Sequence, residues 1–150
     1  MADTGARLLV VDDNKVNRLL LIRALELQGH RGVGAENGRV ALEMLEREAF
    51  DLVLLDIAMP EMDGFQVLER LLANSRLRDL PVIVTSAVEG LESVVRCIEL
   101  GAEDYLAKPV NPVLLKARIG ASLEKKRLRD QQKELVRRFA TREVAQDLQE

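Results

Sequence analysis

Short apolar runs alternate along the chain with longer segments in which apolar residues recur at helical spacing. Five runs have the length and composition of strands, at residues 7–11, 30–35, 51–55, 81–85 and 104–107. The first, third and fourth are continuously or nearly continuously apolar, which is typical of strands buried on both faces of a parallel sheet. The second contains two glycines and is the weakest of the five.

Between these runs, apolar residues return every three or four positions, the period of an amphipathic helix. Such segments lie at residues 16–27, 40–45, 65–72, 91–100 and 113–119. Gly29 and Gly101 are expected to end helices, and Asn37 is expected to begin one. Strands that alternate with helices predict parallel βαβ units, and therefore an α/β fold with a doubly wound sheet.

Polar residues with chemical potential lie at the carboxyl ends of four predicted strands. Asp12 and Asp13 follow the first strand, Asp56 the third, Ser86 the fourth and Lys108 the fifth. In a doubly wound sheet, ligands bind outside these ends, where the strand order reverses. We therefore expect the five side chains to meet at one edge of the sheet.

Three carboxylates at one place repel one another unless a cation lies between them. An all-oxygen donor set suits Mg²⁺ better than Zn²⁺. A lysine and a hydroxyl are unnecessary for the metal, but they are the partners that phosphoryl oxygens need. Because a carboxylate beside Mg²⁺ can attack phosphorus, the pattern predicts a phosphoryl acceptor with Asp56 as the nucleophile.

Each of these residues also has a plainer interpretation, since a single Asp after a strand more often caps a helix. Their occurrence together at successive strand ends favours a functional site. Two other classes of protein remain as alternatives. A haloacid dehalogenase-type phosphohydrolase would need Asp-x-Asp after the first strand, where this chain has Asn14 at the second Asp position. A module that dimerises without phosphorylation would be expected to lack an acidic residue or Lys108.

Four segments resemble the receiver domain of two-component response regulators, over about residues 5–123. They are Leu8–Asn14, Asp51–Gly64, Pro81–Ala87 and Gly101–Pro109. The resemblance implies a flavodoxin-like strand order, 2-1-3-4-5, flanked by five helices. It also implies that Asp56 is the phospho-acceptor and that Asp12 and Asp13 hold Mg²⁺.

The same resemblance implies roles for further residues. The backbone carbonyl of Ala58 is implied as another Mg²⁺ ligand. Lys108 is implied as the partner of phosphate oxygens, with a cis peptide bond before Pro109. Tyr105 resembles the aromatic that changes rotamer when the switch hydroxyl moves toward phosphate.

Two adjacent hydroxyls compete for the switch position. The spacing of the family from the acceptor and from the lysine, 30 and 22 residues here, meets at Ser86. Strand alternation would turn Thr85 to the opposite face, so Ser86 is the predicted switch residue. Phosphorylation would draw Ser86 and Lys108 inward and alter the face formed by the fourth helix, the fifth strand and the fifth helix. The implied phosphodonor is a histidine kinase or histidine phosphotransfer protein that docks near the first helix.

Composition excludes several other functions. The 150 residues are 47% hydrophobic and carry a net charge of −3, which does not favour nucleic-acid binding. One histidine and one cysteine, Cys97, cannot form a zinc site or a Cys/His catalytic pair. No apolar run approaches the roughly 18 residues of a membrane span. A single cysteine suits a reducing cytoplasm. Beyond its own phosphotransfer and dephosphorylation, the domain is not expected to be an enzyme.

Residues 124–150 differ from the rest of the chain. They hold eight of the 22 basic and six of the 25 acidic side chains, a net charge of +2 against −5 for residues 1–123. Neither glycine nor proline occurs after Gly120. We therefore predict a receiver domain over 1–123 and a charged helical extension over 124–150, called the tail below.

The tail carries two further expectations. Apolar residues recur every seven positions at Leu114, Ala121, Leu128 and Leu135, although polar residues interrupt the repeat. An isolated helix of this length would fray, which favours a homodimer through the last helix and the tail over a solvated single helix. Residues 135–145 resemble connectors that precede nucleotide cyclase domains. This favours a receiver at the start of a longer regulator; a single-domain regulator with a plain amphipathic helix is the alternative.

Overall fold

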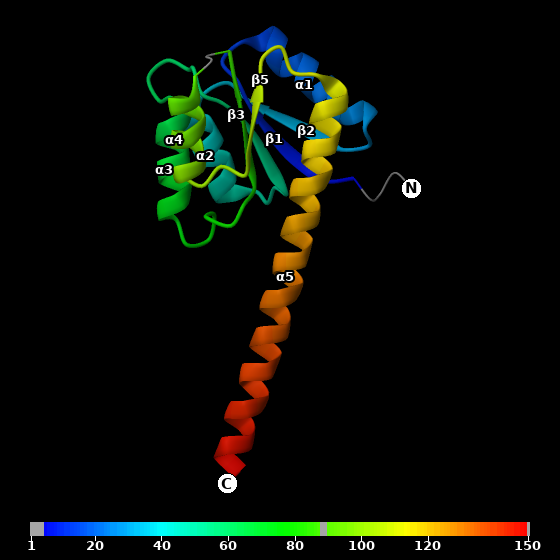
Figure 1. Cartoon of the computed structure of the whole chain (residues 1–150), viewed down its shortest axis with the longest axis vertical. Helices are drawn as coiled ribbons and strands as arrows, with labels where there is room; N and C mark the ends of the chain where they lie inside the picture. The colour runs from blue at the N-terminus through cyan, green and yellow to red at the C-terminus, as the bar shows by residue number, and fades with distance from the viewer. Residues whose placement is uncertain (1–4, 88–89, 150) are drawn as a thin grey trace.

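The computed structural model of the chain describes residues 5–87 and 90–149, and beyond residue 142 it describes the backbone alone. Strands and helices alternate along the chain (Figure 1). The strands are β1 (Arg7–Val11), β2 (Arg31–Ala35), β3 (Leu52–Asp56), β4 (Val82–Ser86) and β5 (Asp104–Ala107). The helices are α1 (Lys15–Leu27), α2 (Gly38–Arg47), α3 (Gly64–Ala73), α4 (Leu91–Glu99) and α5 (Pro112–Gln149).

The strands form one parallel sheet in the order β2-β1-β3-β4-β5, which confirms the predicted topology. The register aligns the carboxyl ends of the central strands. Val11 pairs with Leu55, and Asp56 pairs with Thr85. Asp12 therefore lies level with Asp56 at the same edge of the sheet.

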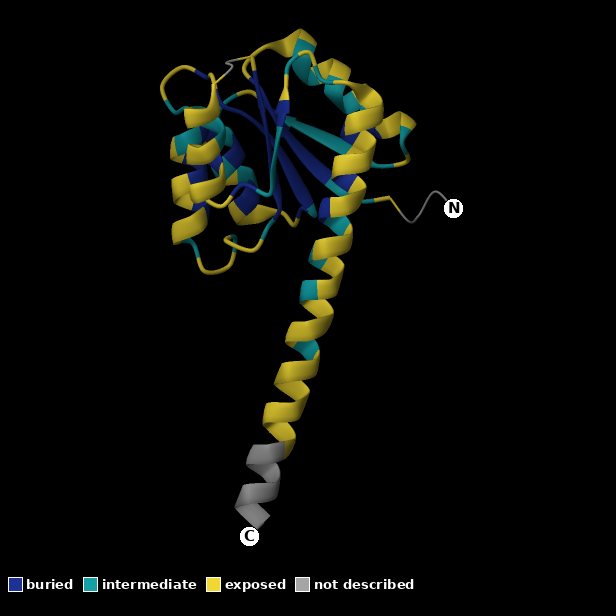
Figure 2. Cartoon of the chain, viewed as in Figure 1, coloured by how far each residue is buried: buried dark blue, intermediate teal, exposed yellow. Residues whose placement is uncertain are grey.

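A hydrophobic core lies on each face of the sheet. Helices α2, α3 and α4 cover one face, where alternate strand residues such as Val53 and Val84 are fully buried. Helices α1 and α5 cover the other face, where Leu54 and Ile83 pack against α5 residues including Ile119. Both faces of β1, β3 and β4 are buried (Figure 2). This two-sided burial is the physical reason for their apolar runs.

Polar side chains cap the starts of α1, α2 and α3. The Asn14 side chain accepts the Asn17 N–H at 3.0 Å at the start of α1, and Asp63 forms a capping box at the start of α3. The Asn37 side chain accepts the Val40 N–H at 2.8 Å, so the predicted cap of α2 is confirmed. These caps satisfy backbone donors that have no partner within the helix.

Strands β3 and β4 each end one residue later than the apolar pattern predicts. Asp56 and Ser86 are the last residues of their strands rather than the first residues after them. The reason is that backbone pairing continues past the apolar run, with Asp56 opposite Thr85 and Ser86 opposite Ala107. A polar side chain at a strand end does not interrupt the backbone ladder.

Helix α5 continues far beyond the sheet as a single element of 38 residues (Figure 1). Its last buried residue is Ser122, and no described side chain from 124 to 142 is buried (Figure 2). Arg129 pairs with Glu103 at 2.9 Å, and Lys133 pairs with Asp79, so ionic contacts continue where apolar contacts end. Among the described residues, no helix has both the length and the apolar character that crossing a bilayer requires.

Candidate functional site

Asp12, Asp13 and Asp56 form an acidic cluster at the carboxyl edge of the sheet. One carboxylate oxygen from each lies within 4.8 Å of the other two. Asp12 and Asp56 are buried, with exposed fractions of 0% and 3%, whereas Asp13 is exposed. The predicted convergence of these three carboxylates is thus what the structure shows, and the cluster is open to solvent on the Asp13 side.

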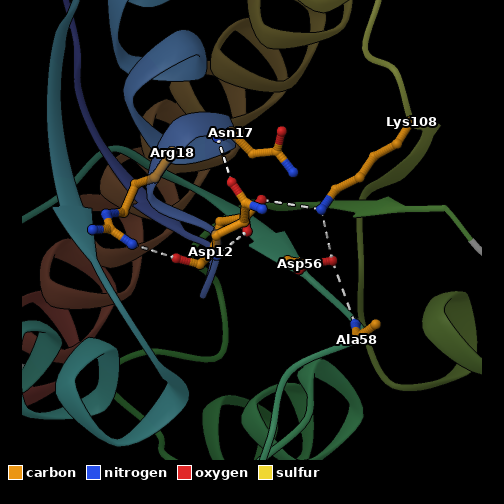
Figure 3. Close-up of polar contacts among 7 residues, drawn as sticks. Asp12, Asn17, Arg18, Asp56, Ala58 and Lys108 are labelled. Carbon is orange, nitrogen blue, oxygen red and sulfur yellow. Dashed lines mark hydrogen bonds and ion pairs between the residues drawn. The ribbon is translucent and has the colours of Figure 1, made fainter.

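Lys108 lies between the two buried carboxylates (Figure 3). Its Nζ is 3.0 Å from Oδ2 of Asp12 and 3.2 Å from Oδ1 of Asp56. The backbone N–H of Lys108 donates to the Ser86 carbonyl at 2.8 Å, which holds the loop after β5 against β4. The Lys108–Pro109 peptide bond is cis, as the resemblance implied. The predicted lysine therefore reaches the acidic cluster although it lies 96 residues after Asp12 in the sequence.

Burial and charge shift the titration of this group of residues. Burial raises the pKa of the Asp56 carboxyl above its ordinary value; the charge of Lys108 opposes the shift, and that of Asp12 adds to it. Burial would lower the pKa of Lys108, but the hydrogen bond to Asp12 and the charges of Asp56 and Asp12 outweigh it, so this pKa is raised. The surroundings therefore favour the charged form of Lys108, whereas burial disfavours the charged form of Asp56.

Backbone donors orient the two buried carboxylates. Oδ1 of Asp12 accepts the N–H of Asn14 at 2.8 Å. Oδ1 of Asp56 accepts the N–H of Ala58 at 3.3 Å. These bonds leave the carboxylates directed toward the shared space that Lys108 also enters (Figure 3).

The acidic cluster has the donor chemistry of a Mg²⁺ site. Three carboxylates against one ammonium leave an excess of two negative charges, which a divalent cation would balance. All donors are oxygen, and the exposed side leaves room for the water ligands that Mg²⁺ keeps. Within the part of the chain that the structure describes, this is the one group of three or more acidic, histidine or cysteine side chains close enough to hold a metal.

Ser86 and Tyr105 lie on one face of the sheet. Tyr105 is opposite Val84 in the β4–β5 register, and both pack toward α3 and α4. Ser86 follows Val84 by two residues, so alternation places its side chain on that same face. Thr85 has the alternation of Ile83, which packs on the α1 and α5 side. The register thus places the predicted switch residue, Ser86, and the predicted switch aromatic, Tyr105, on the same face of the sheet.

Sequence reasoning missed one residue of the site, Arg18. Its Nη1 donates to the backbone carbonyl of Asp12 at 2.8 Å (Figure 3). The bond is to a main-chain oxygen, so no pairing of residue types could reveal it. The available signal was indirect: a basic residue in the first turns of α1, directly before an apolar run.

Comparison with known proteins identifies the family. Residues 8–120 match the family model of the response regulator receiver domain. The chain belongs to this family. Receiver domains are the regulated modules of two-component systems, and neither this match nor the relatives below favours a haloacid dehalogenase-type phosphohydrolase.

The relatives and solved structures agree with this assignment. The chain is 41% identical over 123 residues to a probable cyclic di-GMP phosphodiesterase of Vibrio cholerae, covering 82% of this chain and 28% of that protein. It is 39% identical over 115 residues to response regulator PleD of Caulobacter vibrioides, covering 77% and 25%. A CheY-like receiver domain protein from Methanospirillum hungatei superposes with a TM-score of 0.77 at 30% identity, covering 83% and 98%. The chain therefore spans about a quarter of the length of these two curated relatives.

Proposed function

We propose that this receiver domain is a phosphoryl-accepting switch in which Asp56 takes the phosphoryl group. The observation that carries the proposal is the position of Lys108 Nζ, 3.0 Å from Asp12 and 3.2 Å from Asp56, beside an exposed third carboxylate. A half-buried lysine shared by two aspartates supplies the cation that phosphoryl oxygens need. The acidic cluster supplies the donors for a divalent ion.

The residues of the chain have distinct parts in the transfer. Bound Mg²⁺, held by Asp12, Asp13, Asp56 and the Ala58 carbonyl, would neutralise the carboxylates and the phosphoryl oxygens. A carboxylate oxygen of Asp56 attacks phosphorus; the new O–P bond forms as the N–P bond to the donor histidine breaks, and the imidazole leaves with that electron pair. Lys108 stabilises negative charge on the transferred group.

The bound phosphoryl group then shifts an equilibrium between two conformations. The phosphoryl group carries roughly −1.5 to −2 charges, which replace the single charge of the Asp56 carboxylate. The new oxygens attract the Ser86 hydroxyl and Lys108. Tyr105, on the same face of the sheet as Ser86, then fills the space that Ser86 leaves. The surface formed by α4, β5 and α5 changes as a result, which is a population shift rather than a new fold.

The surface around the site supports a histidine kinase or phosphotransfer protein as the donor. Val16 and Leu20 of α1 are 65% and 63% exposed, close in sequence to the acidic pair. An apolar hollow of about 600 Å³ lies between α1 and the segment after β5, with Leu20, Pro109 and Val110 in its lining. Exposed apolar side chains beside a phosphoryl site suit a docking partner that must bring a histidine to Asp56.

Labelling by acetyl phosphate in the presence of Mg²⁺ tests the proposal. The wild-type chain is expected to give a slower band on a Phos-tag gel, and Asp56→Asn is expected to give none while remaining folded. Asp130→Asn, which neutralises an exposed aspartate of α5, is the matched control and should label as the wild type does. Equal labelling of Asp56→Asn and the wild type would remove Asp56 from the acceptor role.

The tail supports a homodimer through α5. Its apolar side chains face solvent, with Leu128, Leu135 and Phe139 exposed by 47%, 66% and 64%. A second copy would cover them in a two-helix seam. Because burial ends at Ser122, we place the end of the receiver body at residue 123. Light scattering of the wild type and of Leu135→Glu tests the dimer: a monomeric wild type in both phosphorylation states contradicts it.

We further propose that this receiver controls an enzymatic output domain in a longer protein of the cytoplasm. The support is the Vibrio cholerae relative, a probable cyclic di-GMP phosphodiesterase, of which this chain matches 28%. A helix continuous with α5 would transmit a rotation or a dimer rearrangement to that domain. The native reading frame beyond Glu150 is the test: a stop codon there excludes the idea, and a catalytic domain establishes it.

A further inference from the structure

The backbone carbonyl of Asp12 has a side-chain partner that the proposed transfer does not use. Arg18 reaches it from α1, with Nη1 at 2.8 Å (Figure 3). The other polar groups of Asp12 are also engaged. Its N–H donates to the Ala35 carbonyl at 3.2 Å, Oδ1 accepts from Asn14, and Oδ2 accepts from Lys108. Asp12 is therefore held through its main chain as well as its carboxylate.

Strand β2 leaves the space through which Arg18 approaches. Gly34 lies opposite Val10 in the β1–β2 register. A Cβ on Gly34 would lie 3.0 Å from Cδ and 3.3 Å from Nε of Arg18. Glycine in a strand interior weakens the strand and often marks a place where another group comes close. Here that group is the Arg18 side chain on its way to the Asp12 carbonyl.

We propose that Arg18 is a positioning residue of the acidic cluster, acting through the Asp12 carbonyl; the inference rests on the proposed Mg²⁺ site. The peptide unit is planar, so the direction of this carbonyl sets the plane of the amide that leads into Asp13. Holding the carbonyl fixes how Asp13 is presented relative to Asp12. The rigid guanidinium is suited to this task because its donors keep a fixed geometry.

Arg18 also brings positive charge near the cluster, and two substitutions separate this effect from positioning. Arg18→Met keeps the unbranched stem but removes both the charge and the donor. Gly34→Ala leaves the charge and the donor in the chain, but its Cβ displaces the stem that carries them. Gly32→Ala is the matched control, because its Cβ would meet Ile22 at 3.1 Å and its three nearest contacts are all with that residue.

The experiment measures Mg²⁺ binding to the 150-residue chain by calorimetry, together with the ¹H–¹⁵N resonance of the Asp13 amide in EDTA. Arg18→Met and Gly34→Ala are expected to weaken Mg²⁺ binding about tenfold, the usual effect of losing an outer-shell partner. Both should shift the Asp13 amide resonance without Mg²⁺ present. Labelling by acetyl phosphate should return to the wild-type rate at saturating Mg²⁺. Gly32→Ala should keep the wild-type affinity.

The outcomes are distinguishable. Unchanged Mg²⁺ affinity in Arg18→Met, with a wild type that binds, overturns the role of Arg18 and leaves the proposed function intact. Full affinity in Gly34→Ala overturns positioning, and tighter binding in Arg18→Met would then show that its charge alone acts, because removing a nearby cation favours Mg²⁺ binding. Equal losses of Mg²⁺ affinity in Gly32→Ala and Gly34→Ala would show that any added side chain on β2 disturbs the site, and would also overturn the positioning role of Arg18. A wild-type chain that fails to bind Mg²⁺ overturns the proposed site and this inference together.

Discussion

Crowding of the three carboxylates makes a counterintuitive prediction for Asp56→Asn, a change that removes the proposed acceptor. At 4.8 Å, the upper limit of the separations in this cluster, two unit charges repel by about 3.5 kcal/mol at an effective dielectric constant of about 20. Asp56 has two such neighbours, Asp12 and Asp13. Its attraction to Lys108 at 3.2 Å is worth about 5 kcal/mol on the same scale. The repulsions outweigh the attraction by about 2 kcal/mol. Without Mg²⁺, we therefore expect Asp56→Asn to raise the free energy of unfolding by about 1–2 kcal/mol.

Burial of Asp56 acts in the same direction. The side chain is 3% exposed, and burial raises its pKa, which means that the charged form is disfavoured in the folded state. In excess Mg²⁺, the wild type should become more stable than Asp56→Asn, because a ligand at a hundred times its dissociation constant stabilises the folded state by about 2.7 kcal/mol. The asparagine variant binds the ion less tightly and gains less.

Urea denaturation at neutral pH, in EDTA and in excess Mg²⁺, measures both effects. The slopes of the unfolding curves should be equal, so that the midpoints report stability. Asp130→Asn is the control, since it alters only a surface ion pair with Lys126 and should change stability by less than about 1 kcal/mol in either condition. If Asp56→Asn is less stable than the wild type in EDTA, or if Mg²⁺ stabilises both equally, carboxylate repulsion is not what dominates this site.

Three further predictions follow from single contacts. Burial lowers the pKa of His30, whose Nδ1 accepts a backbone N–H. Because the unfolded chain binds more protons than the folded chain, the urea midpoint of unfolding should fall as pH drops below about 6.5. His30→Gln should not show this loss of stability. Gly64→Ala would bring a Cβ to 2.7 Å from the Asp56 carbonyl oxygen, so stability should fall by about 1–3 kcal/mol and acetyl phosphate labelling should slow; normal labelling would contradict the close approach. Ser86→Ala should remove the phosphorylation-dependent change in the fluorescence of the single tyrosine, whereas Thr85→Val should keep it; the reverse result would reassign the switch hydroxyl.

The sequence by itself determined the fold and the site's principal members. Strands buried on both faces must be apolar throughout, so the runs ending at Val11 and Leu55 identified the centre of a parallel sheet. Parallel strands bring their carboxyl ends to one edge, which is why the sequence alone predicts that Asp12, Asp56 and Lys108 lie together. These predictions depend on hydrophobic periodicity and on topology, and both can be inferred from the order of residues along the chain.

The tertiary structure decided the contacts that depend on how elements pack. Lys108 bridges Asp12 and Asp56 because the loop after β5 is held to the Ser86 carbonyl. Arg18 binds the Asp12 carbonyl because α1 lies close over a glycine of β2. Strands β3 and β4 end one residue later than predicted because backbone pairing does not depend on the polarity of a terminal side chain. Such contacts join backbone atoms or residues distant in sequence, and local residue patterns do not predict them.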